Sequence, residues 1–210
     1  RAAELKIAAR EGAEDALLFP SGMNAVTTAI LAMVSSGSEI VLTSDCYRKT
    51  RQFAGQMLRR LGVKVHLVTP DDYAAIERLF AEKKPRLLVS ESPTNPYLNV
   101  LDLPRVAALA KKHGVKVLID STFATPVNQR PLESGVDLVM HSATKYLGGH
   151  NDLLAGVICG GGELVGAIRE AQSVLGGVCD PHGAYLLLRG LKTLPLRVAR
   201  QNESAQKIAV

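Results

Sequence analysis

Short apolar, β-branched segments alternate with longer amphipathic segments along almost the whole chain. The candidate strands lie at residues 16–19, 39–43, 64–68, 86–90, 116–120, 138–142 and 155–159. Helical patterns lie between them, at about residues 21–36, 47–61, 71–83, 103–113 and 162–175. This alternation is typical of βα units that build a largely parallel sheet. We therefore expect an α/β fold in which helices cover both faces of a mostly parallel sheet.

No repeat, low-complexity tract or linker interrupts this pattern, so the sequence predicts one domain over residues 1–210, with helices from residue 183 onward leading out of it. Its composition, 47% hydrophobic and 21% charged, is that of a globular domain. The three cysteines, Cys46, Cys159 and Cys179, are far apart and have no CxxC spacing. This argues against a disulfide framework and a zinc site, and favours a reducing compartment.

The formal net charge of +5 raises the question of a nucleic-acid partner, and "YRKTRQ" (47–52) is the densest basic segment. Aromatic residues make up only 4% of the chain and no nucleic-acid motif accompanies the charge, so small anionic ligands are favoured. No segment approaches the ~20 apolar residues of a membrane span, and the first residues show no signal-peptide pattern. We expect a cytoplasmic protein with neither nucleic-acid nor membrane partners.

Most of the unusual chemistry of the sequence follows the candidate strands. Ligands of parallel sheets collect at the carboxyl ends of the strands. The segments found there are "PSGMNA", "SDCYRKT", "ESPTNP", "DSTFATP" and "SATKY". These loops therefore hold the candidate site.

Lys145 lies just after a candidate strand, among small hydroxyl residues and before a glycine pair. A lysine that is desolvated there can lose its proton and become an amine nucleophile for carbonyls. Taken alone it would be a surface lysine in a turn. Its neighbours, however, match what pyridoxal phosphate needs, which is a lysine for the aldehyde, an acid for the pyridine nitrogen, donors for the phosphate and a face for the ring.

Asp120 ends a candidate strand and could hold the ring nitrogen protonated, although a capping role in a turn is the alternative. Thr122 follows it and is placed in the same cofactor-binding set. Ser21, Gly22 and Met23 open a helix directly after a strand and present backbone N–H groups to an anion. The alternative for this segment is an ordinary helix N-cap.

Ser142 and Thr144 flank Lys145 and could add hydroxyl donors to the same phosphate. Tyr47 could supply the flat face for the ring, although a single tyrosine is more often a half-buried core residue. Asn95 stands between two prolines in "SPTNP" and could bond the phenolic oxygen of the ring, or serve only as a turn residue.

Five segments occur in the order and at the spacing seen in one enzyme family: "SGMNA", "ESPTNP", "DSTFATP", "HSATKYLGGHND" and "RGLKTLPLR". Over essentially its whole length the chain resembles the Cys/Met-metabolism family of fold-type-I pyridoxal-phosphate enzymes. That family includes cystathionine γ-synthase, cystathionine β- and γ-lyases, methionine γ-lyase and homoserine sulfhydrylases. The resemblance implies the large, aspartate-aminotransferase-like cofactor domain of these enzymes.

The resemblance also implies roles for individual residues. The catalytic residues would be Lys145, which carries the cofactor and shuttles protons, Asp120 at the pyridine nitrogen and Tyr47 stacked on the ring. Gly22, Met23, Ser142 and Thr144 would hold the phosphate, with Asn95 at the phenolic oxygen.

Two further parts of the family pattern are expected outside these residues. One is a Tyr-x-Arg segment, upstream of residue 1, that reaches into the neighbouring subunit's site. The other is a smaller C-terminal domain whose arginine binds the substrate carboxylate. The resemblance thus implies a homodimer or homotetramer with shared active sites, in which the full-length enzyme acts on small amino-acid substrates.

After Tyr47 the family usually has two small residues, whereas this chain has "CYRKTRQF". This departure and "GGHNDLLAG" resemble cystathionine γ-synthases of the plant type and their bacterial relatives, which implies a plastid location if the source is a plant. Arg48 and Lys49, together with Arg51, would place cations beside the cofactor and favour an anionic leaving group, as in O-phosphohomoserine. The alternative is a solvated helix face.

The implied reaction is a γ-replacement that joins cysteine to an activated homoserine ester in methionine biosynthesis, the transsulfuration step that gives cystathionine. Two alternatives stay open. One is a cystathionine or methionine lyase of the same family. The other is a cofactor-binding fragment without turnover.

Overall fold

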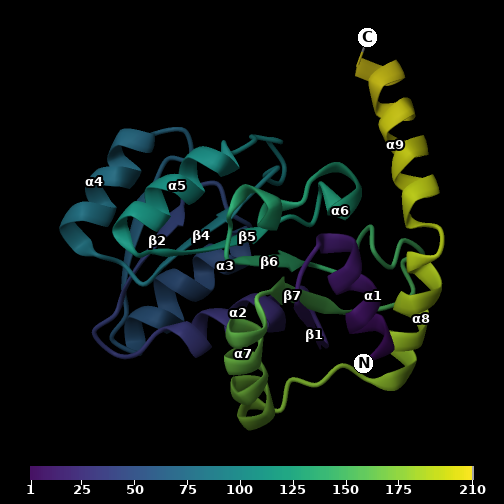
Figure 1. The fold of residues 1–210 in the computed structure, drawn as a ribbon, viewed down its shortest axis with the longest axis horizontal. Helices are drawn as coiled ribbons and strands as arrows, with labels where there is room; N and C mark the ends of the chain where they lie inside the picture. The colour runs from purple at the N-terminus through teal and green to yellow at the C-terminus, as the bar shows by residue number, and fades with distance from the viewer. Residues whose placement is uncertain (210) are drawn as a thin grey trace.

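The computed structural model describes residues 1–209, and a single seven-stranded sheet lies at its centre (Figure 1). The sheet has the order β1-β7-β6-β5-β4-β2-β3. Its strands are β1 (Asp15–Phe19), β2 (Glu39–Thr43), β3 (Lys64–Val68), β4 (Leu87–Glu91), β5 (Lys116–Asp120), β6 (Leu138–His141) and β7 (Gly156–Gly160). The strands β2 to β6 pair in parallel, whereas β7 is antiparallel to both β6 and β1. The prediction of a mostly parallel α/β sheet is confirmed.

Helices cover both faces of the sheet. On one face lie α1 (Ala2–Glu11), α4 (Tyr73–Lys83), α5 (Leu103–His113) and α8 (Pro181–Leu191). On the other lie α2 (Gly22–Met33), α3 (Arg48–Gln52) with the π-helix that follows it, and α7 (Gly162–Leu175). Two short helical segments, α6 (Thr125–Asn128) and a 3-10 turn (Pro131–Ser134), connect β5 to β6.

The alternation of side chains along each strand produces two hydrophobic cores, one on each face of the sheet. In β5, Val117 and Ile119 join the core under α4 and α5, whereas Leu118 between them joins the core under α2 and α7. A strand covered on both faces is apolar at every position. This explains why the strands appear in the sequence as continuous apolar runs.

Two predicted helices differ from those in the structure. The pattern at 21–36 predicts a helix that is longer than α2, which ends at Met33 because Val34 is extended with φ −122° and ψ 152°. The single helix expected at 47–61 is α3 followed by a π-helix, Phe53–Leu58, before a last helical turn. The inserted residue shifts the helix phase, and Phe53, Ala54 and Leu58 are buried there.

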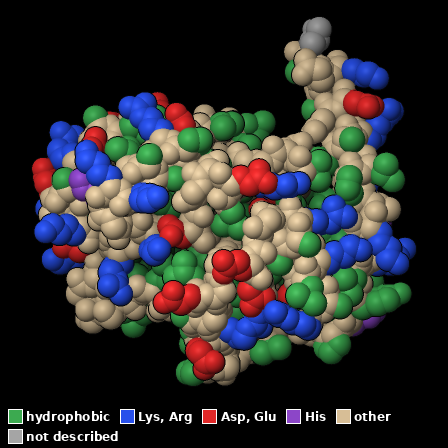
Figure 2. All heavy atoms as spheres, in the orientation of Figure 1, with side chains coloured by type: hydrophobic (Ala, Val, Ile, Leu, Met, Phe, Trp, Pro, Cys, Tyr) green, Lys and Arg blue, Asp and Glu red, His purple; other side chains and the backbone are tan. Residues whose placement is uncertain are grey.

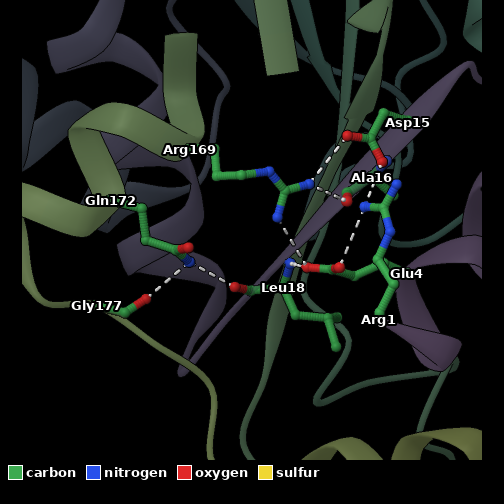
Figure 3. Close-up of polar contacts among 8 residues, drawn as sticks. All are labelled: Arg1, Glu4, Asp15, Ala16, Leu18, Arg169, Gln172 and Gly177. Carbon is green, nitrogen blue, oxygen red and sulfur yellow. Dashed lines mark hydrogen bonds and ion pairs between the residues drawn. The ribbon is translucent and has the colours of Figure 1, made fainter. Parts of the chain in front are cut away.

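The edge strand β1 is held by side chains from α1 and α7 (Figure 3). The N–H of Leu18 donates to Glu4 Oε1 at 3.1 Å, and its carbonyl accepts from Gln172 Nε2 at 2.6 Å. Arg169 Nη2 donates to Asp15 Oδ2 at 2.9 Å and to the carbonyl of Ala16 at 3.3 Å. Backbone groups on the outer edge of β1 therefore have side-chain partners, which closes an edge that could otherwise pair with another chain.

The surface shows how the net positive charge is distributed. On the face in Figure 2, Lys and Arg side chains lie near α4 and α5, along α8 and α9 (Leu194–Ala209), and between α7 and the start of α1, with Asp and Glu side chains among them. The positive charge on this face is thus spread over several regions. Within residues 1–209, no helix is both long enough and apolar enough to cross a membrane.

Candidate active site at the carboxyl edge of the sheet

A cavity of about 690 Å³ lies at the carboxyl ends of the strands. Because β1 is antiparallel to β7 and β7 is antiparallel to β6, β1 points the same way as the parallel strands. The loops after β1, β2, β4, β5 and β6 therefore meet at one edge of the sheet. All ten residues predicted to bind the cofactor line this cavity: Ser21, Gly22, Met23, Tyr47, Asn95, Asp120, Thr122, Ser142, Thr144 and Lys145.

The N-terminus of α2 forms one wall of the cavity. Ser21 caps the helix, and its Oγ accepts from the N–H of Asn24 at 3.1 Å. A Cβ on Gly22 would lie 2.9 Å from Cβ of Ser142, and one on Gly156 would lie 2.3 Å from the carbonyl oxygen of Ser21. Glycine at both positions lets this helix end approach the sheet closely. The first N–H groups of a helix have no partner within it and attract anions.

Asp120 lies at the end of β5 and is held by Thr122. Its Oδ1 accepts from the N–H of Thr122 at 3.0 Å and from Oγ1 of Thr122 at 2.5 Å. Burial raises the pKa of Asp120 above its ordinary value, and the two Thr122 donors and the nearby His141 oppose this rise. Thr122 also accepts the N–H of Ser142 at 2.8 Å and so connects the loops after β5 and β6.

The turn that follows β6 presents Lys145 to the cavity. Main-chain bonds fix this turn: the N–H of Lys145 donates to the carbonyl of Ser142 at 3.0 Å, and its carbonyl accepts from Gly149 at 2.7 Å. The lysine side chain is exposed. Among residues 1–209, no carboxylate lies within 4.0 Å of its Nζ. The amine is thus free to react with a bound group.

The hydroxyl of Thr144 has partners within the protein. Its Oγ1 donates to the carbonyl of Ala155 at 3.1 Å and accepts the N–H of Ala155 at 3.0 Å. A bond from this hydroxyl to a phosphate would require the side chain to rotate.

Tyr47 and Asn95 line the cavity from two other loops. Tyr47 is 42% exposed, so part of its surface is open to a group bound in the cavity. Asn95 lies in a loop with two cis peptide bonds, Ser92–Pro93 and Asn95–Pro96. The structure does not bring Arg48 and Lys49 to the cavity lining. Both are exposed, and Lys49 Nζ donates to Gln52 Oε1 at 3.1 Å.

Two charged residues of the cavity, one acidic and one basic, had no predicted role. Glu91 ends β4 and is 6% exposed, and the sequence signal was a carboxylate at a strand end, in the same position as Asp120. Arg197 comes from α9, and its signal was its place in "RGLKTLPLR". Arg197 reaches the cavity because of how α9 packs against the rest of the protein, and the local sequence pattern does not predict that packing.

Arg197 binds the turn that carries Lys145. Its guanidinium donates to the carbonyls of Tyr146 at 2.8 Å, Leu147 at 3.5 Å and Gly190 at 2.9 Å. Burial lowers the pKa of Arg197. Gly149, with φ 76°, lies under the guanidinium, and a Cβ there would be 2.1 Å from Nη1. Arg197 thus connects the last two helices to the lysine turn.

We expect Gly149→Ala to lower the free energy of unfolding by about 3 kcal/mol. The left-handed backbone would cost roughly 1–2 kcal/mol, and displacing the guanidinium from its carbonyls a further 1–2 kcal/mol or so. Gly176→Ala is the matched control, because Gly176 has φ 74° and nothing within 4 Å of a Cβ. In urea unfolding, Gly176→Ala should lower the free energy of unfolding by the backbone cost alone. Gly149→Ala should show the same smaller loss when it is made in an Arg197→Ala background, because the guanidinium is then absent. Equal costs at the two glycines would contradict the contact.

The sequence of the chain is similar to those of known proteins. The family model described as "Cys/Met metabolism PLP-dependent enzyme" matches residues 1–210. The chain is 52% identical over 206 residues to cystathionine gamma-synthase 1, chloroplastic, of Arabidopsis thaliana, covering 98% of this chain and 37% of that protein. It is 41% identical to L-methionine gamma-lyase of Pseudomonas putida, covering 98% of this chain and 52% of that protein.

The fold is also similar to that of a solved structure. The crystal structure of metB from Corynebacterium glutamicum superposes with a TM-score of 0.96 at 34% identity, covering 99% of this chain and 54% of that one. The chain thus spans about half the length, or less, of the proteins that it matches here. The resemblance inferred from the motifs is confirmed, and the chain belongs to the Cys/Met metabolism family of PLP-dependent enzymes.

Proposed function

We propose that the protein is a cystathionine γ-synthase, and that residues 1–210 form its large cofactor-binding domain. The reaction joins the sulfur of cysteine to the γ-carbon of an activated homoserine ester and expels the ester group. The observation that carries the proposal is the cavity at the carboxyl edge, which gathers a lysine, a buried carboxylate and a helix N-terminus. The identity to the Arabidopsis γ-synthase supports the choice within the family.

The residues of the cavity fit pyridoxal phosphate. Because residue 22 is a glycine close to Ser142, the N-terminus of α2 has an open space that a side chain would fill. This space, lined by helix N–H groups, is suited to a phosphate. Asp120 is a half-buried acceptor whose pKa is raised by its surroundings, suited to a protonated ring nitrogen. The cavity, about 690 Å³, lies within the roughly 300–1,000 Å³ usual for small-molecule sites. When bound, the cofactor supplies an electron sink for the electrons left on the substrate's α-carbon.

Each residue then has a defined task. Asp120 holds a proton on the ring nitrogen, while Thr122 fixes the carboxylate oxygen that it contacts. The Lys145 amine would take up the proton at the substrate's α-carbon and then one at its β-carbon, because a long flexible amine can reach both. The ring of Tyr47 provides a flat surface beside the site.

A lyase of the same family is the second candidate, favoured by the 41% identity to L-methionine gamma-lyase. The test is an assay of the full-length enzyme with cysteine plus O-phosphohomoserine or O-acetylhomoserine, and separately with cystathionine or methionine alone. We expect cystathionine from the first mixtures. Release of ammonia and an oxo acid from the second, with no cystathionine from the first, would make the protein a lyase. Cofactor absorbance that does not change with any amino acid would indicate binding without turnover.

The assembly and location are also proposals. We propose a homodimer or homotetramer with shared active sites, in the cytoplasm, or in the plastid if the source is a plant. The plastid alternative is supported by the Arabidopsis relative, whose name includes the word chloroplastic.

We expect Lys49→Ala in the full-length enzyme to reduce kcat/KM for O-phosphohomoserine roughly tenfold. A charge-assisted contact to phosphate is worth about 1.5–3 kcal/mol, and the exposure of Lys49 places it near the low end. The loss should be smaller for the uncharged acetyl ester and should shrink as ionic strength rises. Steady-state kinetics with both esters provide the measurement.

Arg59→Ala is the matched control, because Arg59 is an exposed cation at the far end of the same helical segment. An equal loss in both variants would mean a general effect of charge. No loss in either would leave the basic segment as a solvated helix face, as its exposure and the Gln52 contact would then indicate.

A further inference from the structure

Glu91 is a buried carboxyl beside Asp120 for which the proposed chemistry has no role. It is the last residue of β4, is 6% exposed and lines the same cavity. In the parallel pairing of β4 with β5, Glu91 is directly opposite Asp120. Side chains at paired positions of neighbouring strands point to the same face of the sheet. Two carboxyls thus lie side by side at the inner end of the cavity.

The two carboxyls differ in what they contact. Oδ1 of Asp120 accepts two hydrogen bonds from Thr122. Within the part of the chain that the structure describes, Oε2 of Glu91 is buried and has no hydrogen-bond partner. Donors stabilise the charged form of a carboxyl, whereas a buried carboxyl oxygen that has no donor, such as Oε2 of Glu91, favours the neutral form. Of the two, Asp120 is therefore the one that ionises first.

The electrostatic surroundings agree with this assignment. Burial, and then the charge of Asp120, raise the pKa of Glu91 to about 8 from an ordinary 4.5. The backbone N–H groups of Tyr47 and Asn95 oppose the rise, and Asp45 adds to it.

The other titratable groups around the pair are the Cys46 thiol, His141 and the Lys145 amine. Cys46 is buried, and its burial raises the pKa of the thiol, so it stays neutral. His141 is buried behind Asp120, where its Nε2 contacts Glu11 at 2.5 Å. Lys145 lines the same cavity. None of these three groups donates a hydrogen bond to Glu91.

We propose that Glu91 is a neutral carboxylic acid at physiological pH and acts as a positioning residue that keeps a single negative charge at the inner end of the cavity. Its side chain fills the place next to Asp120 without adding a second charge. Two adjacent buried carboxyls share their protons as a pair, so removal of the second proton would change the field around both. The charge state follows from the contacts and surroundings of the two carboxyls and does not depend on the proposed function, whereas its effect on a bound cofactor rests on the proposed function.

The proposal predicts how stability depends on pH. Between about pH 4.5 and 8 the folded protein keeps a proton on Glu91 that the unfolded chain releases. The unfolded state then binds fewer protons than the folded state, so stability falls as pH rises through this window. Glu91→Gln keeps the shape of the side chain and removes the titration.

The experiment uses cofactor-free full-length protein and three variants: Glu91→Gln, Asp120→Asn and the exposed control Glu82→Gln. Infrared spectra at pH 6.5 should show a protonated carboxyl band that Glu91→Gln abolishes and Glu82→Gln retains. The midpoint of thermal unfolding should fall less between pH 6 and 9 in Glu91→Gln than in the wild type. In Asp120→Asn the titration of Glu91 should move to lower pH, because its charged neighbour is gone.

An ionised Glu91 at pH 6.5, or an unchanged pH slope in Glu91→Gln, would overturn the proposal. If Glu91→Gln does not fold, infrared spectra of ¹³C-glutamate-labelled wild type and Asp120→Asn still report the charge state. The band of Glu91 is distinguished from that of the buried Glu11 because only the carboxyl beside Asp120 should titrate at lower pH in the variant. Since neither measurement uses turnover or cofactor, their outcome is separate from the question of synthase or lyase. In cofactor-loaded protein, a pH-dependent step in the absorbance of the cofactor that is present in the wild type and lost in Glu91→Gln would report the effect on the cofactor.

Discussion

Replacing Lys145 with alanine is expected to lower kcat of the full-length enzyme by about 10⁴-fold or more. Proton transfer by a positioned side chain contributes about 10²–10⁴, and the loss of the covalent link to the cofactor adds to that. The variant should fold normally, because main-chain bonds hold the lysine turn and the side chain is exposed. The measurements are steady-state kinetics and thermal unfolding.

Lys192 is the matched control, since it is an exposed lysine at the end of α8 that lies outside the cavity lining. Lys192→Ala should be nearly as active as the wild type. Borohydride reduction of the loaded enzyme, followed by peptide mapping, should place the pyridoxyl group on Lys145. A label on Lys192 or on any other lysine would show that the assignment is wrong.

Asp120→Asn is expected to reduce kcat by roughly 10³-fold or more, with little effect on the fold. A neutral amide cannot hold the ring nitrogen protonated, and an unprotonated ring is a much weaker electron sink. The change costs the fold little because burial already raises the pKa of Asp120 and disfavours its charge. Kinetics with saturating cofactor separate this effect from weaker binding.

Thr122→Val offers a graded comparison for the same site. It removes the hydroxyl that donates to Asp120 at 2.5 Å and accepts the N–H of Ser142 at 2.8 Å. We expect the kcat of Thr122→Val to lie between that of the wild type and that of Asp120→Asn.

Near-normal turnover in Asp120→Asn would refute the pairing of this carboxylate with the ring.

Most of the fold could be predicted because each strand is a short apolar run between polar loops. The predicted bounds of β2, β3 and β5 agree with the structure, and the other strands shift by no more than one residue at either end. The errors in the predicted helices occur where tertiary contacts determine the local structure. Nothing in the apolar periodicity of residues 47–61 predicts the π-helix at Phe53–Leu58.

The site was accessible from the sequence for one geometric reason: the strands that carry it all point the same way. A list of strand-end loops was therefore a list of neighbours in space. Arg197 was missed because its partners, the carbonyls of Tyr146 and Leu147, lie about 50 residues away and carry no side-chain signal. The basic segment after Tyr47 was expected beside the cofactor; Arg48 and Lys49 are exposed and lie outside the cavity lining, so their contact with an anionic substrate stays a prediction.

The position of β1 has a consequence for how the domain forms on the ribosome. Among residues 1–209, β7 is the single strand that pairs with β1, and the Leu18 carbonyl of β1 accepts from Gln172, more than 150 residues later in the chain. Contacts between such distant parts form late in folding. Of the seven strands described here, β1 leaves the exit tunnel before the other six and must therefore wait, unpaired, until β7 has been synthesised. The helix N-terminus that it carries, at Gly22, can join the cavity only then, so nascent chains should gain cofactor affinity in one late step.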